Sequence, residues 1–240
     1  MKTIIASVLA LLLAVSAQQA AAQSLFERLK GGLSKDDSSQ LSDTEVSGGL
    51  REALMVGTER VIGQVGAADG FNLDPDIHIP LPRSLQRMQS ALSAVGLDSL
   101  TGELETRLNR AAEAAAPEAK ALFIDAISNM TVQDAQQILT GPDDAATQYF
   151  RTQTGERLTE LMRPVIETNL EQVGALQAYD NAVSRYGDIP FVPDVSADLT
   201  DYTIDKSMDG IFYYLAKEEA AIRQNPLKRS TDLLQKVFGN

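Results

Sequence analysis

The sequence predicts an all-α fold, a single multi-helix domain of eight or nine helices with at most two very short strands near residues 77–79 and 189–192. Apolar residues recur at three- and four-residue intervals over most of the chain, which is the period of a helix face. Short breaks rich in glycine and proline separate these stretches, and no longer period repeats. We therefore expect packed helices with short connections, not a solenoid.

The first 22 residues have the pattern of a secretory signal peptide. Lys2 supplies a positive start, an apolar run extends from Ile4 to Val15, and three alanines precede Gln23. The apolar run is shorter than the roughly 20 residues that a membrane-spanning helix needs. We expect cleavage before Gln23 and a periplasmic protein with no membrane insertion after cleavage. A flexible leader would then cover residues 23–41, and the helical domain would cover residues 42–240.

The domain is expected to begin with a helix after Ser42. Ser42 and Glu45 have the spacing of a capping box, in which each side chain accepts a hydrogen bond from the other residue's amide. Residues 70–82 contain three prolines, which remove backbone donors and favour extended geometry. This segment predicts a loop with at most a short strand, in which Ile77 and Ile79 pack on the core.

Helical stripes follow over about residues 85–95 and 100–111. Pro117 fits the first turn of the next helix, which reaches about Ile127, because a first-turn residue needs no amide hydrogen.

Thr131 and Asp134 have capping spacing for a short helix that ends before Gly141. The longest stripe runs from about residue 156 to residue 186, and Pro164 within it is expected to kink or divide the helix. Two more helical stripes complete the chain, at residues 204–215 and 230–238.

Composition excludes several classes of function. The formal charge of −12 disfavours nucleic acid and anionic membranes as partners, because binding them requires clustered Lys and Arg. The chain has no cysteine, so thiol catalysis, thiolate metal sites and disulfides are excluded. It has one histidine, His78, so a zinc site with two histidines cannot form within one chain.

Asp74, Asp76 and His78 are the candidate metal ligands. In an extended segment these alternating residues would project on one side, where two carboxylates and an imidazole could meet a metal ion. The alternative is a polar loop in which Asp74 forms a turn and His78 faces solvent.

Several polar residues on predicted helices are candidate ligand-binding residues. Arg107, Arg110 and Glu113 lie near Asn109, and an arginine there could bind a carboxylate or phosphate in bidentate fashion. Arg110 and Glu113 also have the spacing of an ordinary ion pair within a helix. The same two interpretations apply to two further arginines, Arg151 and Arg163.

The stretch 141–147 has features of an anion-binding helix start. Asp143 and Asp144 argue against that interpretation, because they would already occupy the positive end of the helix dipole. A column of aspartates at positions 198, 201, 205 and 209 is expected to be a solvated helix face.

A set of motifs in this chain together resembles one known family. The motifs are Gly48–Thr58, Ile79–Pro82, Leu108–Pro117, Gly141–Thr147, Tyr149–Phe150, Asp198–Tyr202 and Lys206–Gly210. They are similar to a family of exported bacterial proteins known as a domain of unknown function, number 4197, over about residues 42–239. The resemblance implies an exported, mostly helical bacterial protein, and it brings no activity, cofactor or catalytic residue.

We expect a non-enzymatic protein, without a cofactor, that binds an envelope partner protein or a small apolar ligand between its helices. One alternative is a hydrolase that uses paired carboxylates such as Glu113 and Asp125 with a bound metal. Another is a structural or stress-related envelope protein. The sequence contains neither a Gly-x-Ser-x-Gly elbow nor a phosphate-binding loop, which argues against the enzyme.

Overall fold

The computed structural model describes residues 42–83, 85–86, 98–171 and 195–224, without the side chains of residues 98–101 and 195–198. These residues are helical or irregular and contain no strand, which confirms the all-α prediction. The helices are α2 (Asp43–Val65), α4 (Asp98–Ala115), the 3-10 turn η1 (Ala116–Glu118), α5 (Ala119–Ser128), α6 (Val132–Thr140), α7 (Ala145–Glu171) and α9 (Val195–Gln224).

The expected number of eight or nine helices is not confirmed. The signal peptide, the leader, the strand near 189–192 and the helix at 230–238 lie outside the described residues, as does most of the stripe at 85–95. No helix in the described ranges is both long enough and apolar enough to cross a membrane.

Two helices begin with the predicted capping boxes. The carboxylate of Glu45 accepts a hydrogen bond from the Ser42 amide at 2.9 Å, and the Ser42 hydroxyl accepts one from the Glu45 amide. Thr131 and Asp134 form the same pair at the start of α6, and the Thr131 hydrogen bonds lower the pKa of Asp134. These contacts join residues three apart, so the local sequence suffices to predict them.

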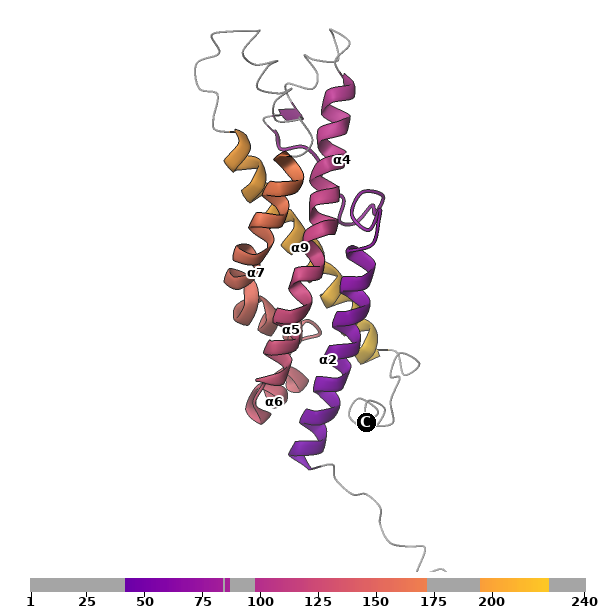
Figure 1. Ribbon diagram of the computed structural model, residues 1–240. Helices are drawn as coiled ribbons and strands as arrows, with labels where there is room; N and C mark the ends of the chain where they lie inside the picture. The colour runs from indigo at the N-terminus through magenta and orange to yellow at the C-terminus, as the bar shows by residue number, and fades with distance from the viewer. Residues whose placement is uncertain (1–41, 84, 87–97, 172–194, 225–240) are drawn as a thin grey trace, which may run out of the picture. The chain divides into compact units, whose positions relative to one another are not determined.

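Four helices, α2, α4, α7 and α9, run side by side with alternating direction (Figure 1). α7 packs against both α4 and α9, and α2 packs against α9 and α5. The short helices α5 and α6 follow α4 and lead back into α7 (Figure 1). The arrangement is an antiparallel helical bundle with an extra pair of short helices at one end.

Aromatic rings from three helices meet in the core. Phe123 of α5 lies 5.2 Å from Phe150 of α7 and 6.0 Å from Phe212 of α9, measured between ring centroids. All three side chains are buried. Tilted and edge-on contacts at these distances stabilise the packing beyond the area that they bury.

Helix α7 begins close to the helix start expected at residues 141–147 and differs from the prediction at Pro164. It begins at Ala145 and continues through Pro164 to Glu171 without being divided. Residues 172–186 of the predicted stripe lie outside the described residues. Met162 and Ile166, on either side of the proline, are fully buried. Tertiary packing of these flanking residues compensates for the hydrogen bond that a proline removes from a helix.

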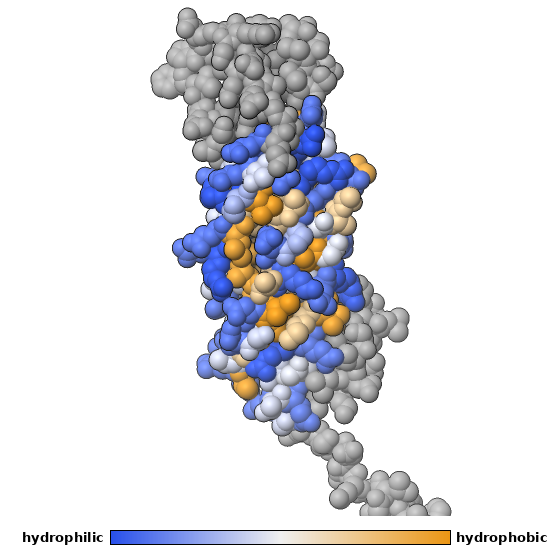
Figure 2. Space-filling view, viewed as in Figure 1, coloured by the Kyte–Doolittle hydropathy of each residue, from blue (hydrophilic) through white to orange (hydrophobic). Residues whose placement is uncertain are grey.

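The surface shows apolar residues interspersed with hydrophilic ones on the face drawn in Figure 2. In the described ranges the large apolar residues with substantial exposure are few, and Leu73 is the most exposed at 72%. Such scattered residues are normal for a protein surface and do not by themselves mark a binding site.

Candidate functional site

The candidate metal ligands do not converge. One carboxylate oxygen of Asp74 accepts from the amides of Asp76 and Ile77, so the segment turns here, as the polar-loop interpretation predicts, and does not line up the three candidate ligands. The other oxygen accepts from the Tyr214 hydroxyl, and Asp76 pairs with Lys217 at 3.0 Å. The structure brings together no cluster of three metal-ligating side chains in the described ranges.

These contacts tie the loop to α9 and change two ionisation equilibria. The hydrogen bond to Asp74 is the largest cause that raises the pKa of Tyr214 to about 12. The hydrogen bond from Lys217 is the largest cause that lowers the pKa of Asp76. Both shifts follow from local pairing, which is typical of structural as well as functional sites.

The other side of the same loop is held by polar side chains of α4. The side-chain amide of Asn109 binds both the N–H and the C=O of Ile79, each at 2.8 Å. His78 contacts the Asn72 carbonyl and the Glu105 carboxylate through its two ring nitrogens, each at 2.9 Å. No strand forms near 77–79, where at most a very short one was expected, and Asn109 supplies the donor and acceptor that a neighbouring strand would offer.

Glu113 is a buried carboxylate on the same face of α4. One of its oxygens accepts from the amides of Phe71 and Asn72, at 3.1 and 3.0 Å. The other accepts from Arg110 at 2.7 Å, and Arg110 also binds Asp69. The bond to Glu113 is the largest cause that raises the pKa of Arg110. The predicted ion pair of Arg110 and Glu113 therefore forms and anchors the loop.

The remaining candidate arginines also bind acidic side chains of this chain. Arg107 lies 3.7 Å from Glu103 on its own helix. Arg163 and Arg151 of α7 face Asp201 and Asp209 of α9 at 2.7 and 3.9 Å. Arg151 also lies over the ring of Phe212. All three pairs are well exposed, so each contributes little to stability.

The paired-carboxylate interpretation gains no support from the geometry. Asp125, the proposed partner of Glu113, is exposed on α5 and binds Arg157 and Asn129. Both oxygens of Glu113 bind donors of the loop and of Arg110. The two carboxylates therefore have separate partners, and they do not face a shared position where a substrate could bind.

A second buried carboxylate is Glu219 of α9, which no motif in the sequence indicates as a functional residue. It accepts from the amides of Ala146 and Thr147 at 2.9 and 3.0 Å and from the Thr147 hydroxyl at 2.9 Å. These are first-turn donors of α7. The stretch 141–147 is thus an anion-binding helix start, contrary to the prediction, and its anion belongs to the protein itself.

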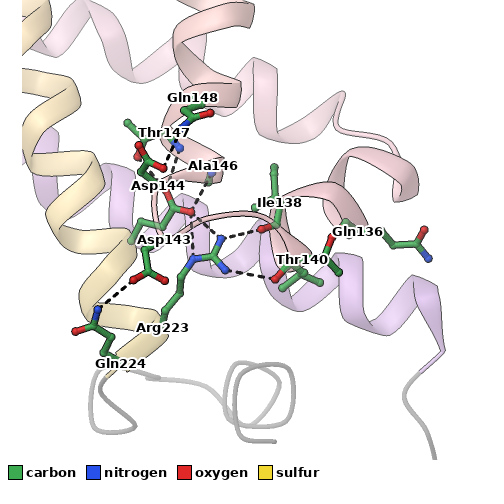
Figure 3. Close-up of polar contacts among 12 residues, drawn as sticks. Gln136, Ile138, Thr140, Asp143, Asp144, Ala146, Thr147, Gln148, Arg223 and Gln224 are labelled. Atoms are coloured by element: carbon green, nitrogen blue, oxygen red, sulfur yellow. Dashed lines mark hydrogen bonds and ion pairs between the residues drawn. The ribbon is translucent and has the colours of Figure 1, made fainter.

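Asp143 and Asp144 do not compete for this position. Asp143 accepts from the side-chain amide of Gln224 at 3.3 Å, and Asp144 accepts from that of Gln148 at 2.9 Å. Figure 3 shows both carboxylates beside the turn between α6 and α7. They leave the first amides of α7 to Glu219.

Arg223 completes this cluster, which we call the α6–α7 clamp (Glu219, Arg223, Ala146, Thr147 and Ile138). Its guanidinium binds Glu219 at 2.8 Å and the Ile138 carbonyl at 2.8 Å (Figure 3). Arg223 therefore caps the last turn of α6 while Glu219 caps the first turn of α7. The spacing of Glu219 and Arg223 fits a helical ion pair, but no local pattern reveals the other helices.

A hollow lies beside the clamp, and we call it the α2–α7–α9 groove. Its empty volume is about 260 Å³, part of which is open to solvent. It is lined by, among others, Gly57 and Thr58 of α2, Ala146 and Phe150 of α7, and Leu215 and Ile222 of α9. The lining is mainly apolar, and Glu218 and Glu219 add two carboxylates to it.

Two features shape the groove. Gly57 has no side chain, and a Cβ built there would lie 3.5 Å from Glu218 and 3.6 Å from Ile222. Thr58 is 1% exposed, and its hydroxyl has no hydrogen-bond partner among the described residues. A buried hydroxyl without a partner costs about 1–3 kcal/mol. The groove thus combines space with mainly apolar walls, and the Thr58 hydroxyl is buried behind them.

Two stretches that carry the family resemblance, 48–58 and 141–150, supply the α2 and α7 walls of this groove. No curated protein and no solved structure matches the chain. A family of proteins of unknown function matches residues 40–239, which include every described helix. Because this match covers most of its length, the chain belongs to the family described as Protein of unknown function (DUF4197).

Proposed function

We propose that this is a non-enzymatic periplasmic protein that binds a partner protein of the envelope by accepting an apolar side chain in the α2–α7–α9 groove. The observation that carries the proposal is the half-open apolar groove between α2, α7 and α9. The export pattern of residues 1–22 supports the location.

The size of the groove favours a protein partner over a small molecule. Drug-sized ligands and cofactors occupy pockets of about 300–1,000 Å³ and are largely enclosed by them. The empty volume here, about 260 Å³, includes space that is open to solvent. Such a groove accommodates one or two side chains that project from a larger partner.

The charges near the groove specify the partner further. Glu218 lines the groove and pairs with Arg60, and Glu219 pairs with Arg223. Asp143 and Asp144 lie next to the clamp and bind neutral amides. A partner segment with a cation next to its apolar anchor therefore complements this end of the groove.

The buried carboxylates argue against a hydrolase. Glu113 and Glu219 are the buried acidic side chains in the described ranges, and each binds main-chain amides and one arginine. These contacts hold a loop and a helix start. A general acid or base needs an oxygen within reach of a substrate proton, and both oxygens of each glutamate already bind the protein.

Native mass spectrometry of the full mature chain, purified from the periplasm of its own bacterium, tests the proposal. Wild-type protein is expected to retain a defined protein partner. Gly57→Leu should abolish that complex, because the new side chain fills the groove. Gly63→Leu on the same helix is the matched control, because a Cβ at Gly63 has nothing within 4 Å.

Circular dichroism would establish that both variants fold. If Gly57→Leu does not fold, Ile222→Lys at the last turns of α9 replaces it and should also abolish the complex. A bound small molecule instead of a protein, or a complex that survives both groove variants, would overturn the proposal.

A further inference from the structure

Arg51 of α2 is an arginine without an acidic partner among the described residues. Each other arginine or lysine of the helices named above pairs with a carboxylate of the described chain. Arg51 instead donates one hydrogen bond, from its Nη2 to the Met130 carbonyl at 2.5 Å. The lack of an ion pair is unexpected in a chain with 33 acidic and 21 basic residues.

The guanidinium of Arg51 is partly shielded from water. Its Nε is buried and has no hydrogen-bond partner among the described residues. Its Nη1 also lacks a partner among these residues, but it is not buried. A cation in such a place attracts an anion more strongly than a fully hydrated cation does, because less water screens the charge. Nη1 is therefore a charged donor that remains open to a ligand.

Two exposed apolar side chains lie beside this donor. Met55 follows Arg51 by one helical turn, so the two side chains lie on the same face of α2. Val132 is the first residue of α6, which packs against α2, and it lies two positions beyond the Met130 carbonyl that Arg51 binds. Met55 and Val132 are each 37% exposed. We call Arg51, Met55 and Val132 the α2–α6 patch.

The acidic group closest to the patch is already bound. Burial is the largest cause that raises the pKa of Tyr149, the charge of Asp134 raises it further, and the charge of Arg51 opposes the rise. Asp134 and Arg51 thus both lie near this phenol. One oxygen of Asp134 accepts from the amide and the hydroxyl of Thr131, at 2.9 and 2.7 Å. Asp134 therefore caps α6 and leaves Arg51 without a counter-ion.

The chemistry of the patch fits a single negative charge next to an apolar group. The formal charge of −12 repels a dianionic phosphate more strongly than a carboxylate. Both apolar side chains of the patch are open to solvent, so a small carboxylic acid would gain little contact there. A protein segment adds contacts on either side of its carboxylate, and these offset the entropy that is lost on binding.

We propose that the α2–α6 patch is a second binding site, which takes a segment of a partner protein with an aspartate or glutamate next to an apolar side chain. The carboxylate accepts a hydrogen bond from Nη1 of Arg51, and the apolar side chain packs on Met55 and Val132. Gly57 of the groove is two residues from Met55, and residues two apart lie on different sides of a helix. The inference is therefore independent of the proposed function and does not require an occupied groove.

Two tripeptides that differ only in one charge test the site. Acetyl-Leu-Asp-Leu-amide carries the carboxylate, and acetyl-Leu-Asn-Leu-amide has the same shape without it. Residues 23–240 with isotope-labelled methionine and arginine report binding through the NMR signals of the Met55 methyl group and the Arg51 Nε–H group. The aspartate peptide should shift both signals and bind at least about fivefold more tightly than the asparagine peptide, because a charge-assisted hydrogen bond is roughly twice as strong as a neutral one.

Arg51→Gln should reduce the affinity for the aspartate peptide to that for the asparagine peptide. Arg157→Gln on α7 is the matched control, because it removes the same charge from an exposed arginine that pairs with Asp125. This control should leave both affinities unchanged. Circular dichroism would establish that both variants fold.

If Arg51→Gln does not fold, a pair of variants at the exposed Met55 replaces it. Met55→Glu places a carboxylate one helical turn from Arg51 and should prevent binding of the aspartate peptide. Met55→Gln has the same shape without the charge and should keep the preference for the aspartate peptide. Equal affinities of the two peptides for the wild type, no binding of either, or shifts that are largest at other methionines would overturn the inference.

Discussion

The Glu219 carboxylate should contribute a large share of the stability of the α6–α7 clamp. One oxygen accepts from the Ala146 amide and from Arg223, and the other accepts from the amide and the hydroxyl of Thr147. Glu219→Gln turns one of these oxygens into an NH₂ donor that faces two other donors. Two charge-assisted hydrogen bonds are lost, at about 1.5 kcal/mol each, so we expect a loss of about 3 kcal/mol.

Urea unfolding of residues 23–240, followed by far-ultraviolet circular dichroism, measures this loss. Glu167→Gln, at an exposed position of α7, is the matched control. It removes the same charge and should change the free energy of unfolding by no more than about 0.5 kcal/mol. If Glu219→Gln behaves like this control, Glu219 does not cap α7 and the reasoning about the clamp is refuted.

A double-mutant cycle with Arg223→Met separates the ion pair from the capping. The side chains of Glu219 and Arg223 are 7% and 12% exposed, so solvent screens their interaction only partly. The coupling energy should fall at about 1–3 kcal/mol. A coupling near zero would mean that each side chain stabilises its own helix end independently.

Three further predictions concern the loop and α9. Gly210→Ala should destabilise the protein by about 1–3 kcal/mol, because its Cβ would lie 2.6 Å from the ring of Phe71 in the loop. Gly63→Ala is the control and should stabilise the protein by about 0.5–1 kcal/mol, and urea unfolding of both variants measures the difference. Asn109→Ala should cost about 3 kcal/mol, because the buried N–H and C=O of Ile79 lose their partners, and a loss below about 1 kcal/mol would show that water replaces the side chain. The pKa of Tyr214 is raised to about 12 from an ordinary value of 10, so the hydrogen bond to Asp74 stabilises the fold fully below pH 10 and loses this effect as the pH rises toward 12. The difference in free energy of unfolding between wild type and Tyr214→Phe should therefore shrink from pH 10 to pH 12, and a constant difference would contradict the role of this hydrogen bond.

The fold class and the helix starts follow from the sequence because their causes are local. Ser42 with Glu45 and Thr131 with Asp134 satisfy the first amides of their helices within one turn. The turn at Asp74, which the polar-loop interpretation predicts, has a local cause as well. Asp74 stands before a proline, and its side chain accepts a hydrogen bond from the amide two residues on.

The candidate site could not be predicted because its decisive contacts join distant residues. Glu219 reaches the start of α7 across 72 to 73 positions, and Asn109 reaches Ile79 across 30. A sequence shows that a glutamate or an arginine is present, but not which helix end it faces. The sequence predicts that Arg151 and Arg163 are polar residues of helices, but their acidic partners on α9 follow from the packing of α7 against that helix.

A buried glutamate can be a catalytic group or a helix cap, and its neighbours decide between these two roles. In an active site, at least one oxygen faces the position of a substrate; at a cap, the oxygens face amides of the protein. Glu113 and Glu219 both belong to the second class by geometry. The apolar groove beside the clamp is therefore a better candidate binding site than the buried acidic residues. The groove exists because Gly57 has no side chain there and because Glu219 fixes the start of the α7 wall that bears Ala146 and Phe150.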